Sequence, residues 1–184
     1  MANFQHLGDE LAHQGHIWRV VRAEFAAPDG QPFTRDIVRS PGAVAVVPLV
    51  IGTDGTPNVR LLSQYRPAYD RTVIEIPAGM RDIPGEPPVE TGRRELVEEA
   101  GLAAGDMIHL LDLLPSPGMS DAVTIIYLAV DCDEVDADLQ GPEELHMTVF
   151  DVTLADALTM IDRGEIADAK TVAGLLLTQR HLQS

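Results

Sequence analysis

The 184-residue sequence predicts a mixed α/β domain in which helices pack against a sheet. In its first half, short apolar runs alternate with turn residues, a pattern typical of β-strands. Between residues 88 and 100 the apolar residues follow helical spacing instead, and two more helical segments close the chain. This succession of strands, helix, strands and helices within one short chain indicates a layered α/β fold.

The strands are predicted from apolar runs and from the turns between them. Residues 16–25 and 33–39 flank the Pro-Asp-Gly turn at 28–30. Residues 43–51 (AVAVVPLVI) are almost continuously apolar, as expected of a strand buried on both faces. The Asp-Gly pair at 54–55 predicts a hairpin turn after this strand. The remaining strands are expected at residues 59–64, 73–76, 108–114 and 123–130.

Three helices are predicted, the first two with recognisable ends. The first covers residues 88–100, because Pro88 suits a first helical turn and Gly101 suits the position just past the last turn. Thr153 is a suitable N-cap for the second helix, and Gly164 suits its end. The second and third helices are expected at residues 154–163 and 168–181.

Composition and charge exclude several classes of function. Thirteen Lys and Arg residues against 29 Asp and Glu residues give a net charge of −16, which disfavours binding to nucleic acid or to an anionic membrane. An anionic ligand would therefore need another source of positive charge, for which a divalent cation is the obvious candidate. The single cysteine, Cys132, excludes an internal disulfide and a cysteine-built zinc site. The start, MANFQHLGDE, lacks the features of a signal peptide, so we expect a cytoplasmic protein.

Three carboxylates on the first helix point to a metal site. Glu95 and Glu99 are four residues apart and share one helix face, and Glu98 lies beside them. Such carboxylates repel one another unless a cation lies among them, and Mg²⁺ prefers oxygen ligands of this kind. The alternative is an acidic helix face that is simply solvated.

Two neighbouring features belong to the same segment. Glu86 lies eight residues before Arg94, so the two side chains are expected to form an ion pair across the junction between loop and helix. The Pro-Ala-Gly sequence at 77–79 predicts a tight turn, and its free carbonyl groups are candidate metal ligands.

The segment from Gly79 to Leu102 resembles the box of the Nudix hydrolases, which is a Gly, then a Glu, then REUxEExGU with U aliphatic. Residues 94–102 read RELVEEAGL and match every defined position, and Glu86 stands at the expected distance before them. Gly79 precedes Glu86 by seven residues, one more than in the usual box, so the path of the intervening loop differs. This resemblance implies an α/β/α sandwich with an N-terminal antiparallel β-sheet.

The resemblance also implies roles for the box residues. Glu95 and Glu99 correspond to the main metal ligands, with the Ala78 carbonyl contributing. Glu98 corresponds to a third ligand or to a residue that assists catalysis. The metal is expected to be Mg²⁺, with Mn²⁺ as the alternative. Structural roles, holding the loop to the helix, are implied for Gly79, Glu86 and Arg94.

Further blocks resemble the ADP-ribose pyrophosphatase branch of this family. Pro117, within SPGMSD, lies fifteen residues after Leu102, where a proline marks that branch. The resemblance implies hydrolysis of ADP-ribose to AMP and ribose 5-phosphate by a homodimer. It implies that residues 1–42 are strands of a swapped dimerisation sheet and that residues 43–184 are the Nudix domain. The other similar blocks are FTRDIVRSPGAVAVVPL, LLSQYRPAYD, EIPAG and RGEIADAKTVAGLLL.

In this branch a loop glutamate between the last strands serves as general base. Counting back from the RGEI block places that loop at residues 140–144, where Glu143 and Glu144 are the candidates, with a slight preference for Glu144. Asp121 is a weaker alternative.

The resemblance also implies substrate contacts. Arg66 matches a phosphate-binding position, for which a guanidinium is well suited. Arg35 and Trp18 are expected to bind the adenine, by stacking or at its edge, and Pro117 lies in a loop of the site. For Trp18, the alternative is an aromatic residue of the core or the dimer interface.

Two other functions remain open at this level. A related enzyme for another nucleotide sugar, such as GDP-mannose, would share the metal chemistry and differ only in its contacts with base and sugar. A non-catalytic sensor of ADP-ribose would be expected to have a damaged box and an additional domain, and this sequence shows neither.

Overall fold

The apolar run at residues 43–51 forms strand β4 (Ala43–Ile51), at the centre of a seven-stranded sheet in a computed structural model. The structure describes residues 3–52, 54–138 and 144–184. Val44 and Val46 on one face of β4 belong to a core cluster that includes Leu96 of the first helix. Ala45 and Val47 on the other face belong to a second cluster, which includes residues of the last two helices. The prediction of a strand buried on both faces is confirmed.

The seven-stranded sheet belongs to one of two compact units, which comprises Ala43–Leu113 and Thr124–Ser184. Its main order is β10-β5-β4-β9-β8, with β6 paired to β5 and β7 paired to β4. β4 and β9 are parallel and the other pairs are antiparallel. The strands are β5 (Pro57–Arg66), β6 (Arg71–Glu75), β7 (Ala78–Met80), β8 (Leu102–Leu113), β9 (Thr124–Glu134) and β10 (Thr148–Thr153).

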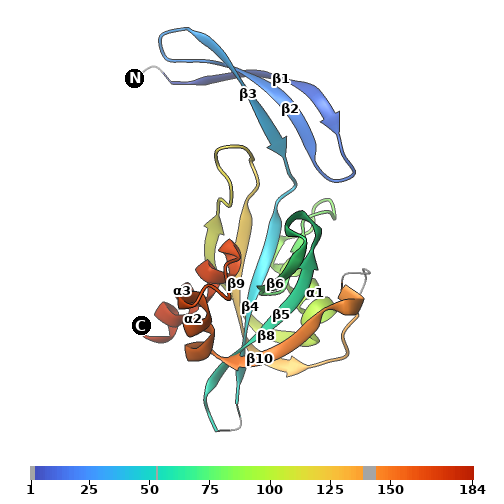
Figure 1. The fold of residues 1–184 in the computed structure, drawn as a ribbon, viewed down its shortest axis with the longest axis vertical. Coiled ribbons are helices and arrows are strands. Elements are labelled where there is room, and N and C mark those ends of the chain that lie inside the picture. The colour runs from blue at the N-terminus through green and yellow to red at the C-terminus, as the bar shows by residue number, and fades with distance from the viewer. Residues whose placement is uncertain (1–2, 53, 139–143) are drawn as a thin grey trace. The chain divides into compact units, whose positions relative to one another are not determined.

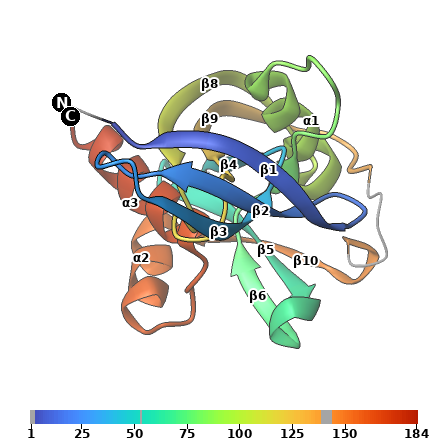
Figure 2. The ribbon, with the colours of Figure 1, turned by 90° about the horizontal axis from the view of Figure 1, so that it is seen from above.

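The helices cover both faces of this sheet. Helix α1 (Pro88–Ala100) packs on one face, and α2 (Leu154–Asp162) and α3 (Ala169–Leu182) pack on the other (Figures 1 and 2). The Thr153 hydroxyl accepts a hydrogen bond from the Asp156 amide, as predicted for an N-cap. The unit is therefore an α/β/α sandwich, and this prediction is confirmed.

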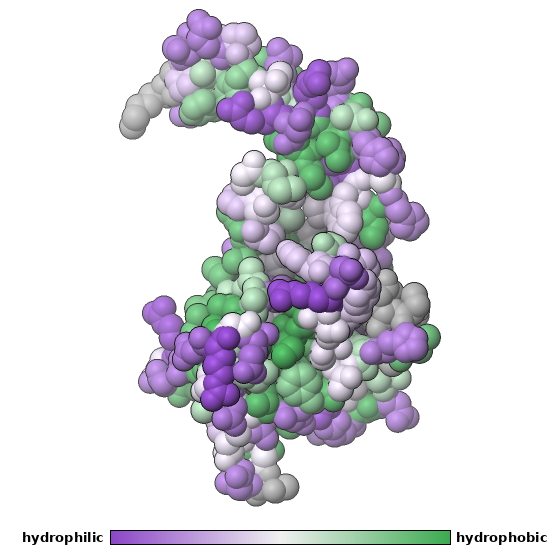
Figure 3. Space-filling view, in the orientation of Figure 1, coloured by the Kyte–Doolittle hydropathy of each residue, from purple (hydrophilic) through white to green (hydrophobic). Residues whose placement is uncertain are grey.

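The N-terminal unit comprises the residues up to Gly42 together with Leu114–Val123. Its antiparallel sheet has the order β1-β2-β3, formed by β1 (Gln5–Gln14), β2 (Arg19–Ala26) and β3 (Pro32–Arg39). The expected N-terminal antiparallel sheet is thus present. Figure 3 shows apolar residues among hydrophilic ones at the molecular surface, and the exposed apolar residues include Leu7 and Leu11 of β1.

Several strands differ from their predictions. Strand β1 was not predicted, because all ten of its residues are exposed and its sequence lacks apolar alternation. The short strand β7 and strand β10 were also not predicted, and β8 begins at Leu102, six residues before the predicted start. β1 and β7 are defined by their pairing partners rather than by an apolar pattern of their own. Within the described residues, no helix combines the length and apolar character needed to cross a membrane.

Candidate active site

Helix α1 brings the three predicted carboxylates together. It begins at Pro88 and ends before Gly101, whose φ of 61° is the left-handed conformation that favours glycine after a helix. Glu95 and Glu99 lie on the buried side, with 8% and 5% of their surface exposed, whereas Glu98 is half-buried. Burying charged carboxylates is costly unless hydrogen bonds or cations compensate them. The helix therefore presents a negatively charged face towards the sheet.

The backbone of β7 lies directly against these carboxylates. The Ala78 amide donates a hydrogen bond to Oε2 of Glu99 at 2.8 Å. If Gly79 carried a Cβ atom, that atom would lie 1.9 Å from both Cδ and Oε1 of Glu95. Only glycine leaves room for that carboxylate, which gives Gly79 a steric role.

Arg94 is the main cation among the box carboxylates. Its Nη1 atom lies 2.7 Å from Oε1 of Glu95 and 2.9 Å from Oε2 of Glu98. The expected ion pair with Glu86 is present but longer, with 3.7 Å between Nε and Oε1. Partial burial opposes the charge of Arg94, but the carboxylates of Glu95, Glu98 and Glu86 raise its pKa. The spacing predicted Glu86 as the partner but did not predict the contacts within the helix.

The donor atoms at this site suit a hard divalent cation. In the residues that the structure describes, no three His, Cys, Asp or Glu side chains already converge on one point. Arg94 holds Glu95 and Glu98 in their present orientation. Carboxylate oxygens on one helix face, with the β7 backbone alongside, are nevertheless the ligand type that Mg²⁺ and Mn²⁺ bind. Glu95, Glu98, Glu99 and the Ala78 carbonyl could hold such an ion.

Arg66, the predicted phosphate ligand, is held by a carboxylate that the sequence did not single out. Its Nε and Nη2 atoms donate to the two oxygens of Glu75 at 2.6 and 2.8 Å. The guanidinium side chain remains 40% exposed, whereas that of Glu75 is only 5% exposed. Lys170 of α3 contacts the same carboxylate. Arg66 therefore presents a fixed cationic group that is still accessible to an anion.

The N-terminal unit contains an aromatic cavity of about 350 Å³. Arg35 and Pro117, both predicted substrate contacts, line it. Phe33 and Phe25 also line it, with ring centroids 5.3 Å apart and planes inclined by 18°. Trp18 does not line this cavity and is 52% exposed. The sequence indicated Arg35 and Pro117 but not the two phenylalanines, because their side chains meet only when β2 and β3 pair.

Arg35 lies over one of these rings. Its guanidinium carbon is 5.0 Å from the centroid of Phe33, a cation–π distance, and its Nη1 atom donates to the Thr34 carbonyl at 2.7 Å. The cavity is therefore lined by aromatic rings and by a cationic group that contacts one of them.

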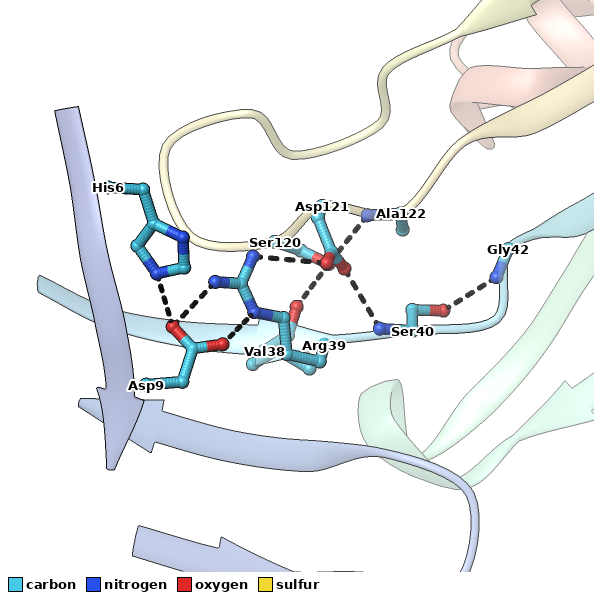
Figure 4. Close-up of polar contacts among 9 residues, drawn as sticks. All are labelled: His6, Asp9, Val38, Arg39, Ser40, Gly42, Ser120, Asp121 and Ala122. Atoms are coloured by element: carbon cyan, nitrogen blue, oxygen red, sulfur yellow. Dashed lines mark hydrogen bonds and ion pairs between the residues drawn. The ribbon is translucent and has the colours of Figure 1, made fainter. Parts of the chain in front are cut away.

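The side chain of Asp121, the weaker candidate for the general base, is held by hydrogen bonds to other residues of the N-terminal unit (Figure 4). It accepts hydrogen bonds from the Ser40 amide at 2.9 Å and from Nη1 of Arg39 at 3.2 Å. Arg39 also binds Asp9 through two hydrogen bonds, which lower the pKa of the Asp9 carboxyl. In this arrangement Asp121 joins the 114–123 loop to β3.

Of the two preferred candidates for the general base, one lies within the described residues and one does not. Glu143 falls outside the described residues. Glu144 is the first residue of a short 3₁₀ helix, η2 (Glu144–His146), which precedes β10. The roles predicted for both residues remain predictions.

Comparisons with known proteins agree with this arrangement. The model of the NUDIX domain family matches residues 40–175. A crystal structure described as that of an ADP compounds hydrolase superimposes with a TM-score of 0.82, covering 98% of this chain and 95% of that one at 22% identity. That likeness shows a shared fold.

Three curated relatives are closer in sequence. The ADP-ribose pyrophosphatase of Mycobacterium tuberculosis is 38% identical over 95% of this chain and 82% of its own length. The ADP-ribose pyrophosphatase of Bacillus subtilis is 35% identical over 94% of this chain and 91% of its own length. The GDP-mannose pyrophosphatase of Citrobacter koseri is 35% identical over 69% of this chain and 68% of its own length.

Proposed function

This chain belongs to the NUDIX family, and we propose that it hydrolyses the diphosphate of ADP-ribose to AMP and ribose 5-phosphate with the help of a divalent metal ion. The observation that most directly supports this substrate is the match of two ADP-ribose pyrophosphatases over 95% and 94% of the chain. The match to a GDP-mannose pyrophosphatase covers only 69% of the chain, which makes GDP-mannose the second candidate.

The carboxylates of helix α1 and the Ala78 carbonyl have the proposed role of binding the metal. Glu95, Glu99 and the Ala78 carbonyl would hold the metal, with Glu98 assisting. Mg²⁺ is the expected ion, with Mn²⁺ as the alternative. The bound metal would neutralise the diphosphate and polarise the phosphorus that is attacked. This neutralisation matters because a chain with a net charge of −16 otherwise repels an anionic substrate.

Arg66 and a loop glutamate would complete the reaction. Arg66, fixed by Glu75, would bind a phosphate oxygen through its exposed guanidinium edge. A water molecule attacks one phosphorus, the bridging P–O bond breaks, and the loop glutamate at 143 or 144 accepts the proton of the water. The leaving phosphate keeps the bridging oxygen, so one water molecule is consumed per diphosphate cleaved.

A direct assay tests this function. Purified protein should convert ADP-ribose to AMP and ribose 5-phosphate in Mg²⁺, and EDTA should stop the reaction because the metal is removed. Chromatography of the products, with GDP-mannose assayed in parallel, is the measurement. Faster turnover of GDP-mannose would assign the second candidate substrate. Binding of ADP-ribose without turnover of either compound would indicate a sensor.

We further propose that the aromatic cavity of the N-terminal unit receives the adenine ring. Replacing Phe33 with Ala should raise KM for ADP-ribose about tenfold, because it removes an aromatic side chain that lines the cavity and supports Arg35, and an aromatic contact contributes roughly 1–3 kcal/mol per base. Trp18→Ala is the comparison variant, because the family resemblance implies that Trp18 contacts the adenine although it lies outside this cavity. Steady-state kinetics of both variants decide the assignment. A larger effect at Trp18 than at Phe33 would contradict it.

A further inference from the structure

Lys170 is the only lysine in this chain, whereas the other twelve of its thirteen Lys and Arg residues are arginines. It lies in the first turn of α3, and its side chain is only 15% exposed. Its Nζ atom contacts Oε2 of Glu75, and it donates to Oδ2 of Asp168 at 3.0 Å. A compact ammonium with three donors fits between two carboxylates, where the wide planar fork of an arginine needs more room.

Glu75 depends on this ammonium. Burial of its carboxylate opposes ionisation, but hydrogen bonds and charges from Arg66 and Lys170 together keep the pKa of Glu75 below its usual value. The carboxylate is thus ionised and binds Arg66 through both of its oxygens. Because one oxygen, Oε2, is shared between Arg66 and Lys170, the position of one cation affects that of the other.

The same part of α3 also fixes the chain that leads to the metal-binding residues. The Ile76 amide donates to Oγ1 of Thr171 at 3.0 Å. Asp168 caps α3 by accepting from the Thr171 amide at 3.0 Å. Two residues after Ile76, the Ala78 amide reaches Glu99. The negative charge of Glu99 is also among the causes that raise the pKa of Arg66, so these groups lie within electrostatic range.

We propose that Lys170 is a positioning residue for the hydrolysis reaction: by holding the buried carboxylate of Glu75, it orients Arg66 to bind the diphosphate of the substrate. The Lys170 ammonium is turned towards two carboxylates, so its effect on the substrate would be exerted through Arg66. This inference rests on the proposed function, since it assigns Arg66 to that substrate.

Replacing Lys170 with Met keeps most of the side-chain stem and removes its charge. Glu75 then binds Arg66 alone, and the guanidinium is drawn further towards the buried carboxylate and away from the substrate. We expect KM for ADP-ribose to rise about tenfold while kcat changes less than about twofold, because a loss of substrate binding alone raises KM. Arg180→Met, which removes one charge from an exposed position of the same helix, should leave both constants unchanged.

A double-mutant cycle distinguishes positioning from a general structural effect. If Lys170 acts through Arg66, then Lys170→Met should cause little further loss of kcat/KM in an Arg66→Ala background. Fully additive losses from the two replacements would overturn the proposal. If Lys170→Met fails to fold at the assay temperature, Lys170→Gln takes its place, because it keeps a hydrogen-bond donor beside Glu75 and removes only the charge. The same rise in KM is expected, and an unchanged KM in that variant would overturn the proposal.

A single lysine also allows a readout that is independent of turnover. Protein labelled with [¹³C]lysine gives one εCH₂ signal in an NMR spectrum, which reports on Lys170 alone. A non-hydrolysable methylene analogue of ADP-ribose, added with Mg²⁺, should shift this signal in the wild-type protein and not in Arg66→Ala. An equal shift in both would overturn the proposal. If the wild-type protein neither hydrolyses nor binds ADP-ribose, the proposed function itself is wrong.

Discussion

Glu99→Gln should leave the fold nearly intact and reduce kcat for ADP-ribose about 10³-fold. The carboxamide oxygen can still accept the hydrogen bond that the Ala78 amide donates to Oε2 of Glu99, so the link between β7 and α1 survives. The negative charge that would bind the metal is lost, and a bound metal contributes several kcal/mol to stabilisation of the transition state. Product chromatography at saturating Mg²⁺ measures this effect, and circular dichroism checks the fold.

Glu90→Gln is the matched control. Glu90 lies in the first turn of the same helix, is itself exposed, and has no predicted role in metal binding. It should retain wild-type activity. Calorimetric titration with Mg²⁺ should show weakened binding in Glu99→Gln only. Full activity of Glu99→Gln would contradict the assignment of this residue as a metal ligand.

Gly79→Ala should reduce kcat/KM about 10²-fold, although it adds only one methyl group. The new Cβ atom would overlap the Glu95 carboxylate, at 1.9 Å from its Cδ atom, a separation at which no side chain fits. Either Glu95 rotates away or β7 moves, and both displace a predicted metal ligand. A displacement of about 1 Å at a catalytic group can cost about 10²-fold. Kinetics measured over a range of Mg²⁺ concentrations should show a higher metal requirement.

Gly8→Ala provides the comparison for this steric effect. Gly8 lies in strand β1, and a Cβ atom added there would have no atom within 4 Å other than those of its chain neighbours. The replacement should leave the kinetic constants within about twofold of wild type, as is usual for surface changes that create no clash. Equal losses at Gly8 and Gly79 would show that the contact with Glu95 is not the cause.

Local sequence was sufficient to predict the helix that carries the candidate metal site. Glu95 and Glu99 had to share a face once the segment was helical, and Pro88 and Gly101 marked the ends of that helix. The continuous apolar run of β4 likewise predicted a layered fold, since a strand apolar on both faces requires a cover on each side. The box motif and the −16 charge together indicated metal-assisted chemistry on a diphosphate.

Other features arose only from contacts between distant segments. Strand β1 forms because its residues pair with those of β2, not because its own sequence has an apolar face. Phe25 and Phe33 stack because β2 and β3 pair in a register that places them opposite each other. No local spacing encodes such pairings.

The ion-pair partner of each charged side chain also depends on tertiary contacts. A layered α/β domain with an acidic box helix could be predicted from the residues alone, because helical and strand periods are local properties of the chain. Only the folded chain shows that Arg94 lies closer to Glu95 and Glu98 than to Glu86. It also shows that Glu75 lies between Arg66 and Lys170, although Lys170 is 95 residues further along the chain than Glu75. A charged group pairs with whichever opposite charge folding brings within reach, and that distance is fixed only when the sheet and its helices have packed.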